Sequence, residues 1–466
     1  MSRRTVLRRG LGAAGVLALV GGLEELFGHQ DSGEVISLRH HGASGDGVHD
    51  DSAAFQRALN AASAGATVVG EPSANYLLNN AQPISFPHDH VTLDLRGAAV
   101  QAGAEAGSET EHILLVSQRT GVRIANARIT APLSVSDTIL STLTLLVIRG
   151  GSHCMVERVK ANCLGATFVW VQTGAHHVVR ANDVLRGSIA AWATDGLEIS
   201  NNRLRDSGGD AINSVGYAGA PSRDLLCVGN DIRGHGRIAI EDYASGGPNS
   251  TIRSVIRANR IGPPAPSTTT GFGISAVGTQ TVIDANIITD AVTYGIEASG
   301  EMSEITHNRL AWTLSAATSA YGATGVIVNS SPIGEREAGS VIANTVIGAA
   351  IGIRVVGRPY VGRVAIAGNK VSDALSVGID ASLSDSGAGS LGAEVSGNTV
   401  DFTRPAATTG TAGERIGIRA GNGARVHGNT IIYSKSARAD GANELPLQLG
   451  PSTFIGRNYV KTGGAS

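Results

Sequence analysis

The chain has 466 residues, of which 42% are hydrophobic, only 4% are aromatic and 62 are glycine. This composition suits a chain that buries a sizeable core, and it argues against disorder, a collagen-type repeat and a small disulfide scaffold. The 37 Lys and Arg residues nearly balance 39 Asp and Glu residues, so the formal charge is only −2. Such a balance offers no electrostatic footprint for phosphate backbones, and we expect no nucleic-acid partner.

Residues 1–30 have the pattern of an export signal. The string SRRTVLR precedes an apolar run over residues 11–23, which is too short and too rich in glycine for a membrane span. The paired Arg3 and Arg4 resemble the twin-arginine motif, which sends folded proteins across the bacterial inner membrane. The resemblance implies a periplasmic or secreted protein that twin-arginine export machinery recognises. No clean cleavage site follows, so an uncleaved leader that tethers the protein remains an alternative.

Residues 34–105 are expected to form an N-terminal cap and the first turns of the fold. A strand over 34–39, a glycine-rich turn, a helix that starts near Asp50 or Asp51, and extended segments at 67–69 and 75–78 follow in order. Phe55, Leu59 and Ala62 recur at helical spacing on one face of that helix. The string GASGDGVHDDSAAFQRAL resembles the N-terminal segment of pectate-lyase-like right-handed parallel β-helix proteins. The resemblance implies a helix that covers the open end of a coil.

A repeat over residues 106–462 can be aligned on asparagine. Residues three before and two after each of these asparagines are apolar in all eleven copies, which argues for two buried columns. The repeat asparagines are Asn182, Asn202, Asn230, Asn259, Asn286, Asn308, Asn344, Asn369, Asn398, Asn429 and Asn458.

The repeat predicts a solenoid of short strands, an all-β, single-stranded right-handed parallel β-helix. Asparagine suits the corner between two strands, since it tolerates a left-handed conformation and its amide can bond to the amides above and below. A Gly-Ile or Gly-Val step opens a further strand in most turns, as at Gly273, Gly325 and Gly417. Gaps of irregular length argue for a coil that keeps its strands while its loops vary.

The three cysteines cannot form a complete disulfide framework, because their number is odd. Cys227 stands in an apolar column where the other copies have Val or Ile, so a buried thiol is expected there. A bridge between Cys154 and Cys163 remains an alternative.

Side chains that follow the Gly-Ile steps should face outward and build one continuous surface. These positions are Ala190, Asn213, Ala239, Ser275, Glu297, Ile327, Arg354, Asp380 and Arg419. Two neighbouring turns, RDSGGDAIN at 205–213 and DIRGHGRIAIEDY at 231–243, are the richest in chemistry. Asp210 and His235 precede Ile residues that we align, Ile212 and Ile238, so we expect them close together on one outer patch.

This patch partly resembles the active strand of polygalacturonase-type glycoside hydrolases. Asp210 within GDAIN, followed one turn later by Gly-His-Gly around His235, carries the likeness, whereas Gly209 replaces a second aspartate of that family. Hydrolysis of a glycosidic bond needs two carboxylates. Asp206 with Asp210, or Asp210 with Glu241 or Asp242, could supply them.

A uronate lyase or C5-epimerase is the alternative chemistry. It needs a base and a group that neutralises the substrate acid, and Arg237, His235 and Tyr243 could act there as base, proton donor and partner. A third interpretation places Ca²⁺ on carboxylates. Its candidate ligands are Asp206, Asp210, Asp231, Glu241 and Asp242. A fourth treats the same residues as turn formers on a solvated rim.

Trp170 and Trp192 are 22 residues apart and each stands five residues after a glycine. They are expected to stack on adjacent turns, where aromatic faces either bind sugar rings or simply pack.

The whole outline, a twin-arginine leader followed by β-helix repeats, resembles the twin-arginine-translocated uncharacterised repeat proteins. That resemblance implies no assigned reaction, and no metal, phosphate-loop or haem motif is present in the sequence. We expect an exported protein that acts on a polysaccharide. Its predicted catalytic residues are Asp210, His235, Arg237, Glu241 and Asp242, and its predicted substrate contacts are Asp206, Asn213, Tyr243 and Glu297. The alternative is a non-catalytic glycan-binding or envelope structural protein.

Overall fold

The computed structural model describes most of the chain beyond residue 32. The described ranges are 33–108, 111–132, 142–245, 250–313, 323–330, 339–357, 364–382, 392–403, 415–421, 423–434, 444–450 and 453–463. The export leader predicted for residues 1–30 lies outside them.

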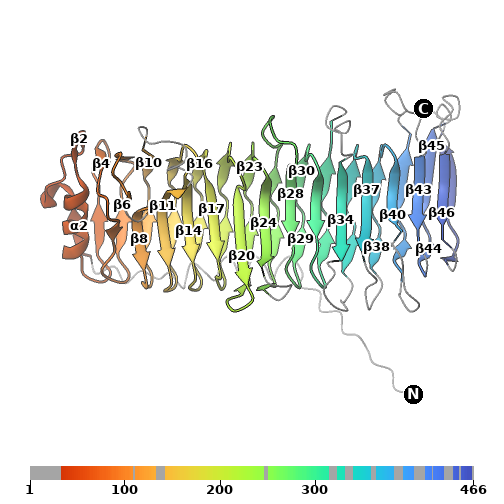
Figure 1. The fold of residues 1–466 in the computed structure, drawn as a ribbon, viewed down its shortest axis with the longest axis horizontal. Helices are drawn as coiled ribbons and strands as arrows, with labels where there is room; N and C mark the ends of the chain where they lie inside the picture. The colour runs from red at the N-terminus through yellow and green to blue at the C-terminus, as the bar shows by residue number, and fades with distance from the viewer. Residues whose placement is uncertain are drawn as a thin grey trace, which may run out of the picture.

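Three long parallel sheets, which we name A, B and C, run the length of a rod (Figure 1). Sheet A contains β1 (Val35–Ser37), β3 (Thr67–Val69), β6 (Thr92–Asp94), β9 (Arg123–Ala125), β12 (Met155–Glu157), β15 (Val178–Arg180), β18 (Glu198–Ser200), β22 (Leu226–Val228), β26 (Val255–Arg257), β29 (Val282–Asp284), β32 (Glu304–Thr306), β35 (Ser340–Ile342), β38 (Ala365–Ala367), β41 (Glu394–Ser396), β44 (Arg425–His427) and β47 (Phe454–Ile455). Sheet B contains β2 (Asp46–Asp50), β4 (Asn75–Leu78), β7 (Ala99–Ala102), β10 (Arg128–Thr130), β13 (Lys160–Asn162), β16 (Asp183–Leu185), β19 (Arg203–Arg205), β23 (Asp231–Arg233), β27 (Arg260–Ile261), β30 (Ile287–Thr289), β33 (Arg309–Ala311), β36 (Thr345–Ile347), β39 (Lys370–Ser372), β42 (Thr399–Phe402), β45 (Thr430–Ser434) and β48 (Tyr459–Gly463). Sheet C contains β5 (Ile84–Ser85), β8 (His112–Ser117), β11 (Thr144–Arg149), β14 (Thr167–Gln172), β17 (Ser188–Trp192), β20 (Ile212–Tyr217), β24 (Ile238–Ser245), β28 (Phe272–Ala276), β31 (Tyr294–Ala298), β34 (Thr324–Ser330), β37 (Ile351–Gly357), β40 (Val377–Ala381), β43 (Arg415–Ala420) and β46 (Glu444–Leu449).

Successive turns of the chain visit the sheets in the order A, B, C, and each strand pairs in parallel with its equivalents in the turns before and after. The molecule is therefore a right-handed parallel β-helix, which confirms the predicted fold class; right-handed crossovers between parallel strands are the general rule. A small extra pair, β21 (Ser222–Arg223) and β25 (Thr251–Ile252), lies outside the three sheets.

The N-terminal end of the rod is covered by α2 (Ser52–Ala61), the expected capping helix (Figure 1). A short 3₁₀ helix that was not predicted, η1 (Arg39–His41), packs beside it. Phe55 of α2 is fully buried, and its ring meets that of Tyr76 edge to face at 5.1 Å. The two aspartates before the helix divide their roles. Asp50 accepts the backbone N–H of Ser52 at 3.0 Å, whereas Asp51 accepts N–H groups of the preceding loop instead of capping the helix.

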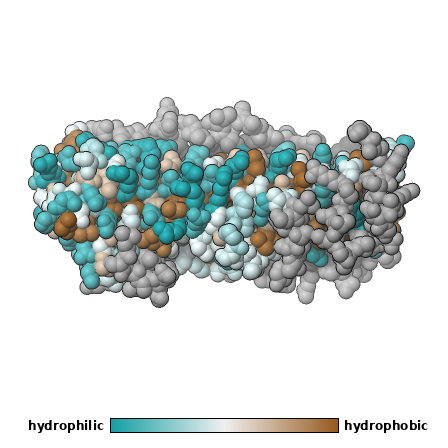
Figure 2. Space-filling view, turned by 90° about the horizontal axis from the view of Figure 1, so that it is seen from above, coloured by the Kyte–Doolittle hydropathy of each residue, from teal (hydrophilic) through white to brown (hydrophobic). Residues whose placement is uncertain are grey.

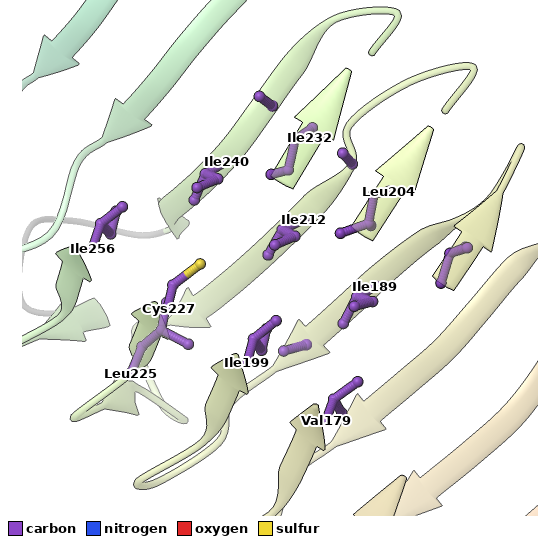
Figure 3. Close-up of a cluster of buried hydrophobic side chains, with 14 of the residues drawn as sticks. Val179, Ile189, Ile199, Leu204, Ile212, Leu225, Cys227, Ile232, Ile240 and Ile256 are labelled. Atoms are coloured by element: carbon purple, nitrogen blue, oxygen red, sulfur yellow. The ribbon is translucent and has the colours of Figure 1, made fainter. Parts of the chain in front are cut away.

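The core consists of stacked apolar columns, and both predicted columns are confirmed. They are the central residues of the strands in sheets A and B, and sheet C supplies a third set (Figure 3). Cys227 is fully buried among Val and Ile side chains, and all three cysteines are free, so the alternative bridge between Cys154 and Cys163 does not form. Ile455 and Val460 on the last strands are exceptions, each 53% exposed.

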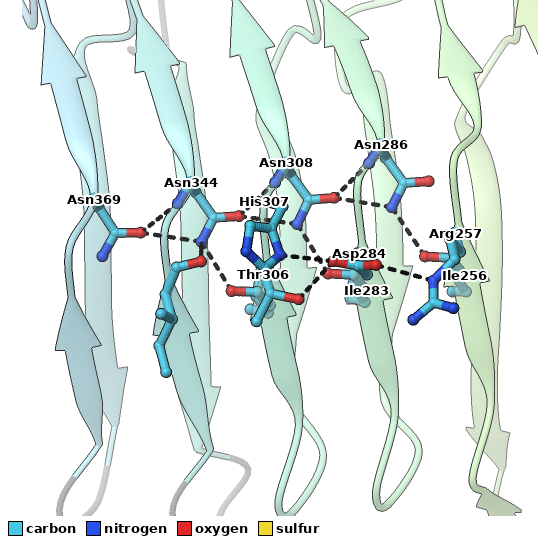
Figure 4. Close-up of polar contacts among 12 residues, drawn as sticks. Ile256, Arg257, Ile283, Asp284, Asn286, Thr306, His307, Asn308, Asn344 and Asn369 are labelled. Carbon is cyan, nitrogen blue, oxygen red and sulfur yellow. Dashed lines mark hydrogen bonds and ion pairs between the residues drawn. The ribbon is translucent and has the colours of Figure 1, made fainter. Parts of the chain in front are cut away.

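The repeat asparagines form a continuous amide ladder between sheets A and B (Figure 4). In a representative turn, Asn286 Nδ2 donates to the carbonyl of Ile256 and to Asn308 Oδ1, both at 2.9 Å. The predicted left-handed conformation, however, belongs to the residue before the asparagine in every repeat except the last, for example to Ala285 with φ of 56°. The turn places that residue at the bend, and the asparagine itself stands immediately before the next strand of sheet B with its amide turned along the rod.

Glycine stands at the second or third position of many strands of sheet C because successive turns pack closely there. A Cβ on Gly325 would lie 2.4 Å from the carbonyl oxygen of Gly352 and 2.5 Å from Val346 Cγ1. The Gly-Ile step therefore marks a position where the backbone of one turn rests directly on the next.

Hydrophilic residues predominate on the described N-terminal half of the face in Figure 2, with hydrophobic ones scattered among them. Within the described ranges, the only helix of any length is too short and too polar to cross a bilayer.

Candidate active site

A polar cluster lies on the outer face of sheet C, where β20 and β24 begin. Strand register places Asn213 of β20 beside Glu241 of β24, and Ser275 of β28 follows in the same row. Asp210 stands two residues before β20, and Arg237 immediately precedes β24. The structure thus brings four of the predicted site residues, Asp210, Asn213, Arg237 and Glu241, into one group, which we call the carboxylate pair site.

Asp210 and Glu241 share their hydrogen-bond donors. Arg237 Nη2 donates to Asp210 Oδ2 and, at 2.8 Å, to Glu241 Oε2. Asn213 Nδ2 likewise donates to both carboxylates, at 3.2 Å in the case of Asp210. The backbone N–H of Ile238 fixes the other Asp210 oxygen at 3.1 Å. Two carboxylate oxygens that bond one nitrogen lie within roughly 6 Å of each other.

The two carboxyl groups are shielded from water while the guanidinium above them is not. The side chains of Asp210 and Glu241 are 11% and 9% exposed, against 53% for Arg237. Burial raises the pKa of Glu241 to about 7, the neighbouring charge of Asp210 adds to the rise, and Arg237 opposes it. Near neutral pH the site therefore holds a carboxyl group that can donate a proton beside a second carboxylate that can act as a base or nucleophile.

Glu297 extends the site by two further turns. It stands on the outer face of β31, in the row that contains Glu241 and Ser275. Ser275 Oγ donates to Glu297 Oε2 at 2.9 Å, and burial raises the pKa of Glu297 although this hydrogen bond lowers it. The row therefore carries two carboxyl groups with raised pKa values, Glu241 and Glu297, on either side of Ser275.

His235 and Asp242 do not join this outer group. The expected alignment of Ile238 with Ile212 is wrong, because β24 starts two residues earlier in register than β20 and Ile212 pairs with Ile240. His235 is fully buried in the turn before β24, and burial lowers its pKa to about 4. Ala239, expected on the outer face, packs within the core.

Asp242 points inward, into the column that also contains Ser214 and Ala276. It is completely buried, neither of its oxygens accepts a hydrogen bond of good geometry, and burial raises its pKa to about 6 against a smaller lowering by Ser254. The odd–even alternation of a strand explains this placement, since the residue after an outward Glu241 must face the core.

The remaining predicted contacts lie at the edges of the site. Tyr243, 44% exposed, follows Glu241 by two residues on the same face of β24. Asp206 is exposed at the bend after β19, where it borders a shallow depression of about 300 Å³ with Gly234 and Thr268.

The five carboxylates considered as Ca²⁺ ligands do not converge. Asp231 belongs to sheet B, Asp242 faces the core, and Asp210 and Glu241 are occupied by Arg237 and Asn213. Across the ranges that the structure describes, no three His, Cys, Asp or Glu side chains are grouped so that they could hold a metal ion.

An aromatic row lies beside the carboxylate pair site, and the sequence predicted only its two tryptophans. Trp170 and Trp192 meet edge to face on adjacent turns with ring centroids 4.5 Å apart, as expected. Tyr217 continues the row at 6.0 Å from Trp192, and His112 precedes it at 6.3 Å from Trp170. Tyr217 and His112 were missed because they stand at opposite ends of strands of different length, so no fixed sequence spacing links them to the tryptophans.

No known family model and no curated protein sequence matches the chain. Among solved structures, the surface adhesin PfbA of Streptococcus pneumoniae is similar at 14% identity and a TM-score of 0.46, with 92% of this chain and 99% of that chain covered. The A-module of the mannuronan C-5 epimerase AlgE6 of Azotobacter vinelandii has 11% identity and a TM-score of 0.41, over 92% and 100% of the two chains. An exopolygalacturonase of Thermotoga maritima has 13% identity and a TM-score of 0.40, over 77% and 91%. At these identities the likeness is one of fold alone.

Proposed function

We propose that the protein cleaves glycosidic bonds of a polysaccharide that lies on the outer face of sheet C. The observation that carries this proposal is the carboxylate pair site, in which Asp210 and Glu241 bond the same guanidinium nitrogen while Glu241 keeps a raised pKa. Glycoside hydrolysis needs one carboxylic acid and one carboxylate, about 5 Å apart in retaining enzymes and farther apart in inverting ones. A shared donor atom favours the shorter spacing.

In this mechanism Glu241 donates its proton to the glycosidic oxygen as the bond to the leaving sugar breaks. Asp210 then attacks or stabilises the positively charged anomeric carbon, and Glu241 takes a proton from the water that completes hydrolysis. Arg237 is the more exposed partner, so a substrate can displace it from the carboxylates without disturbing the strands that hold them.

The test is a release assay with the purified full chain on a panel of acidic and neutral polysaccharides. The wild-type protein should release reducing ends but no unsaturated products that absorb ultraviolet light. The Glu241→Gln and Asp210→Asn variants should release no reducing ends. Unsaturated products would instead establish the lyase alternative, in which Arg237 and Tyr243 are the outward candidates for acid–base work.

A second candidate function is glycan binding without cleavage. One observation favours it: Arg237 bridges both carboxylates in the way that a purely structural ion pair would. Binding of a polysaccharide with no product of either kind would support this candidate over hydrolysis.

We further propose that residues 1–30 direct export by the twin-arginine route, so that the protein is periplasmic, secreted or tethered by its leader, as a member of the twin-arginine-translocated repeat proteins. Arg3 and Arg4 support this proposal. A reporter fused to residues 1–30 should be exported, and the Arg3→Lys, Arg4→Lys double variant should retain it in the cytoplasm. Equal export of the wild-type fusion and of the double-variant fusion would contradict the twin-arginine proposal.

A further inference from the structure

Sheet C carries a second surface feature, on the N-terminal side of the carboxylate pair site. We define the aromatic ladder as Trp170 of β14, Trp192 of β17 and Tyr217 of β20, whose rings meet edge to face on consecutive turns. Trp192 and Tyr217 are 39% and 37% exposed, which leaves ring surface open to solvent. A row of ring surface that runs along the rod suits an extended ligand more than a compact one.

The N-terminal end of the ladder is polar and positively charged. Arg149 of β11 is exposed; its Nε donates to Gln172 Oε1 at 2.7 Å, and its Nη2 lies 3.2 Å from His112 Nε2. No described carboxylate forms an ion pair with this guanidinium, in contrast to Arg237 and Arg253. The side chain therefore presents an uncompensated positive charge.

A depression adjoins this charge. It has a volume of about 630 Å³ and is lined by Gln82, Pro83, Ser85, His112, Leu115 and Arg149. Its lining is mixed in polarity, so it offers both hydrogen bonds and apolar contact next to the guanidinium.

The C-terminal end of the ladder leads directly to the carboxylate pair site. Trp192 pairs with Val215, which pairs with Tyr243, and Tyr243 stands two residues after Glu241 on the same face of β24. Four steps between neighbouring strands separate Arg149 from Glu241, a distance of roughly 19 Å at about 4.8 Å per strand. The depression, the ladder and the carboxylates thus form one continuous track along the rod.

We infer that this track binds a strand of acidic polysaccharide parallel to the rod axis, with the C–H faces of its sugar rings on the aromatic ladder and an acidic group of the strand at Arg149. A sugar ring combines an apolar face with a polar edge, and the ring surface of the ladder borders the hydrogen-bonding groups of Gln172 and Arg149 at its N-terminal end. The positive charge at Arg149 selects an anionic strand. The inference rests on the proposed function, and it assigns the non-reacting part of the substrate to a place several sugars away from Glu241.

The experiment measures binding separately from cleavage. The Glu241→Gln chain is titrated with polygalacturonate, alginate and neutral dextran, and tryptophan fluorescence and calorimetry report binding. Two of the three tryptophans belong to the ladder, and the third, Trp312, is buried with its Nε1 bonded to Ala291 O at 2.5 Å. A fluorescence change therefore reports the ladder.

At least one acidic polysaccharide should quench fluorescence, and dextran should not. Trp192→Ala and Tyr217→Ala should each raise the Kd about tenfold, and Arg149→Gln should raise it while weakening its salt dependence. One matched control is Tyr459→Ala, which removes a ring that is 44% exposed and lies far along the rod. The other is Arg253→Gln, which removes an exposed but paired guanidinium. Both should leave the Kd unchanged. Thermal melting confirms that each variant is folded.

Several results would overturn the inference. One is a Kd that stays unchanged in the folded ladder variants and in Arg149→Gln, and another is binding without a change in tryptophan fluorescence. The inference would also fail if dextran bound as tightly as the acidic polysaccharides, or if neither acidic polysaccharide bound. Failure of the proposed function looks different: the acidic strand would bind through the ladder, yet wild type would release no product.

Discussion

Glu241 shows how a few neighbours can set the chemistry of one side chain. Burial and the charge of Asp210 raise its pKa to about 7, so its acid form is populated at neutral pH. A group that acts as a proton donor works below its pKa. Hydrolytic activity should therefore be high in mildly acidic buffer and fall as the pH rises through about 7.

Substitution of Glu241 should remove this pH dependence of the hydrolytic activity. Glu241→Gln should lower kcat by about 100-fold or more, the usual contribution of a general acid. Glu394→Gln, a 40% exposed carboxylate near His427, is the matched control and should keep both the rate and the pH profile. A Glu241→Gln chain with the wild-type profile would show that the proton comes from elsewhere.

Asp242 is the opposite case, a carboxylate whose environment offers no donor of good geometry. Its pKa is raised from 3.8 to about 6, so folding favours the protonated form. The free energy of unfolding is therefore highest below about pH 4, where Asp242 is protonated in both the folded and the unfolded state. It falls as the pH rises from about 4 to about 6 and stays at the lower value above that pH. At 1.4 kcal/mol per pH unit, roughly 3 kcal/mol is at stake.

The Asp242→Ala chain, which has alanine like its neighbours Ala276 and Ala298 in the same column, should therefore melt at a higher temperature than wild type at pH 7.5. The gain should shrink at pH 4.5. Asp231→Ala, where the carboxylate is 37% exposed, should show no such pH dependence. A wild type that is more stable than Asp242→Ala at both pH values would mean that the buried carboxylate has a partner.

At the scale of elements, the amide ladder fixes how turns stack. Asn286 bonds Ile256 O and Asn308 Oδ1, and its own Oδ1 accepts both the backbone and side-chain N–H groups of Asn259 at 2.9 and 3.0 Å. Asn286→Ala would remove all four of these hydrogen bonds and leave the buried backbone N–H of Asn259 without its acceptor, at a cost of about 1–3 kcal/mol for that group.

We expect Asn286→Ala to lower the melting temperature and to speed proteolysis or hydrogen exchange in the turns around residue 286. Ile287→Ala, at the adjacent 40% exposed position, should change neither measurably. Equal effects of the two substitutions would contradict a special role for the ladder.

The same elements show how far sequence alone reaches. The asparagine and apolar columns recur at fixed offsets within sheets A and B, so the fold, the buried columns and the amide ladder could be predicted. Sheet C is different, because its strands vary from the two residues of β5 to the eight of β24. An alignment on Gly-Ile steps therefore misplaced His235 and Ala239, while Asp210, Arg237 and Glu241 were found by their chemistry. That Asp242 faces inward follows only from the true register of β24.

At the scale of the whole molecule, α2 closes one end of the rod. The first strands β1, β2 and β5 have unpaired edges that could recruit other chains. Phe55, fully buried against Tyr76, anchors the helix there. Phe55→Asp should release α2 and produce oligomers in size-exclusion chromatography.

An exposed substitution on the same helix, Asn60→Asp, is the control and should leave the elution volume unchanged. The Phe55→Asp variant would contradict this account if it eluted at the wild-type volume and kept the wild-type melting temperature. The helix would then not be needed to protect the edges of the first strands.

The most direct measurement of the functional account is a crystal structure of the Glu241→Gln chain with an acidic oligosaccharide. The account predicts a sugar chain on the outer face of sheet C, parallel to the rod, with rings on Trp192 and Tyr217 and one glycosidic oxygen within hydrogen-bond reach of residue 241. Sugar bound on sheet A or B, or across the rod and away from Asp210 and residue 241, would contradict it.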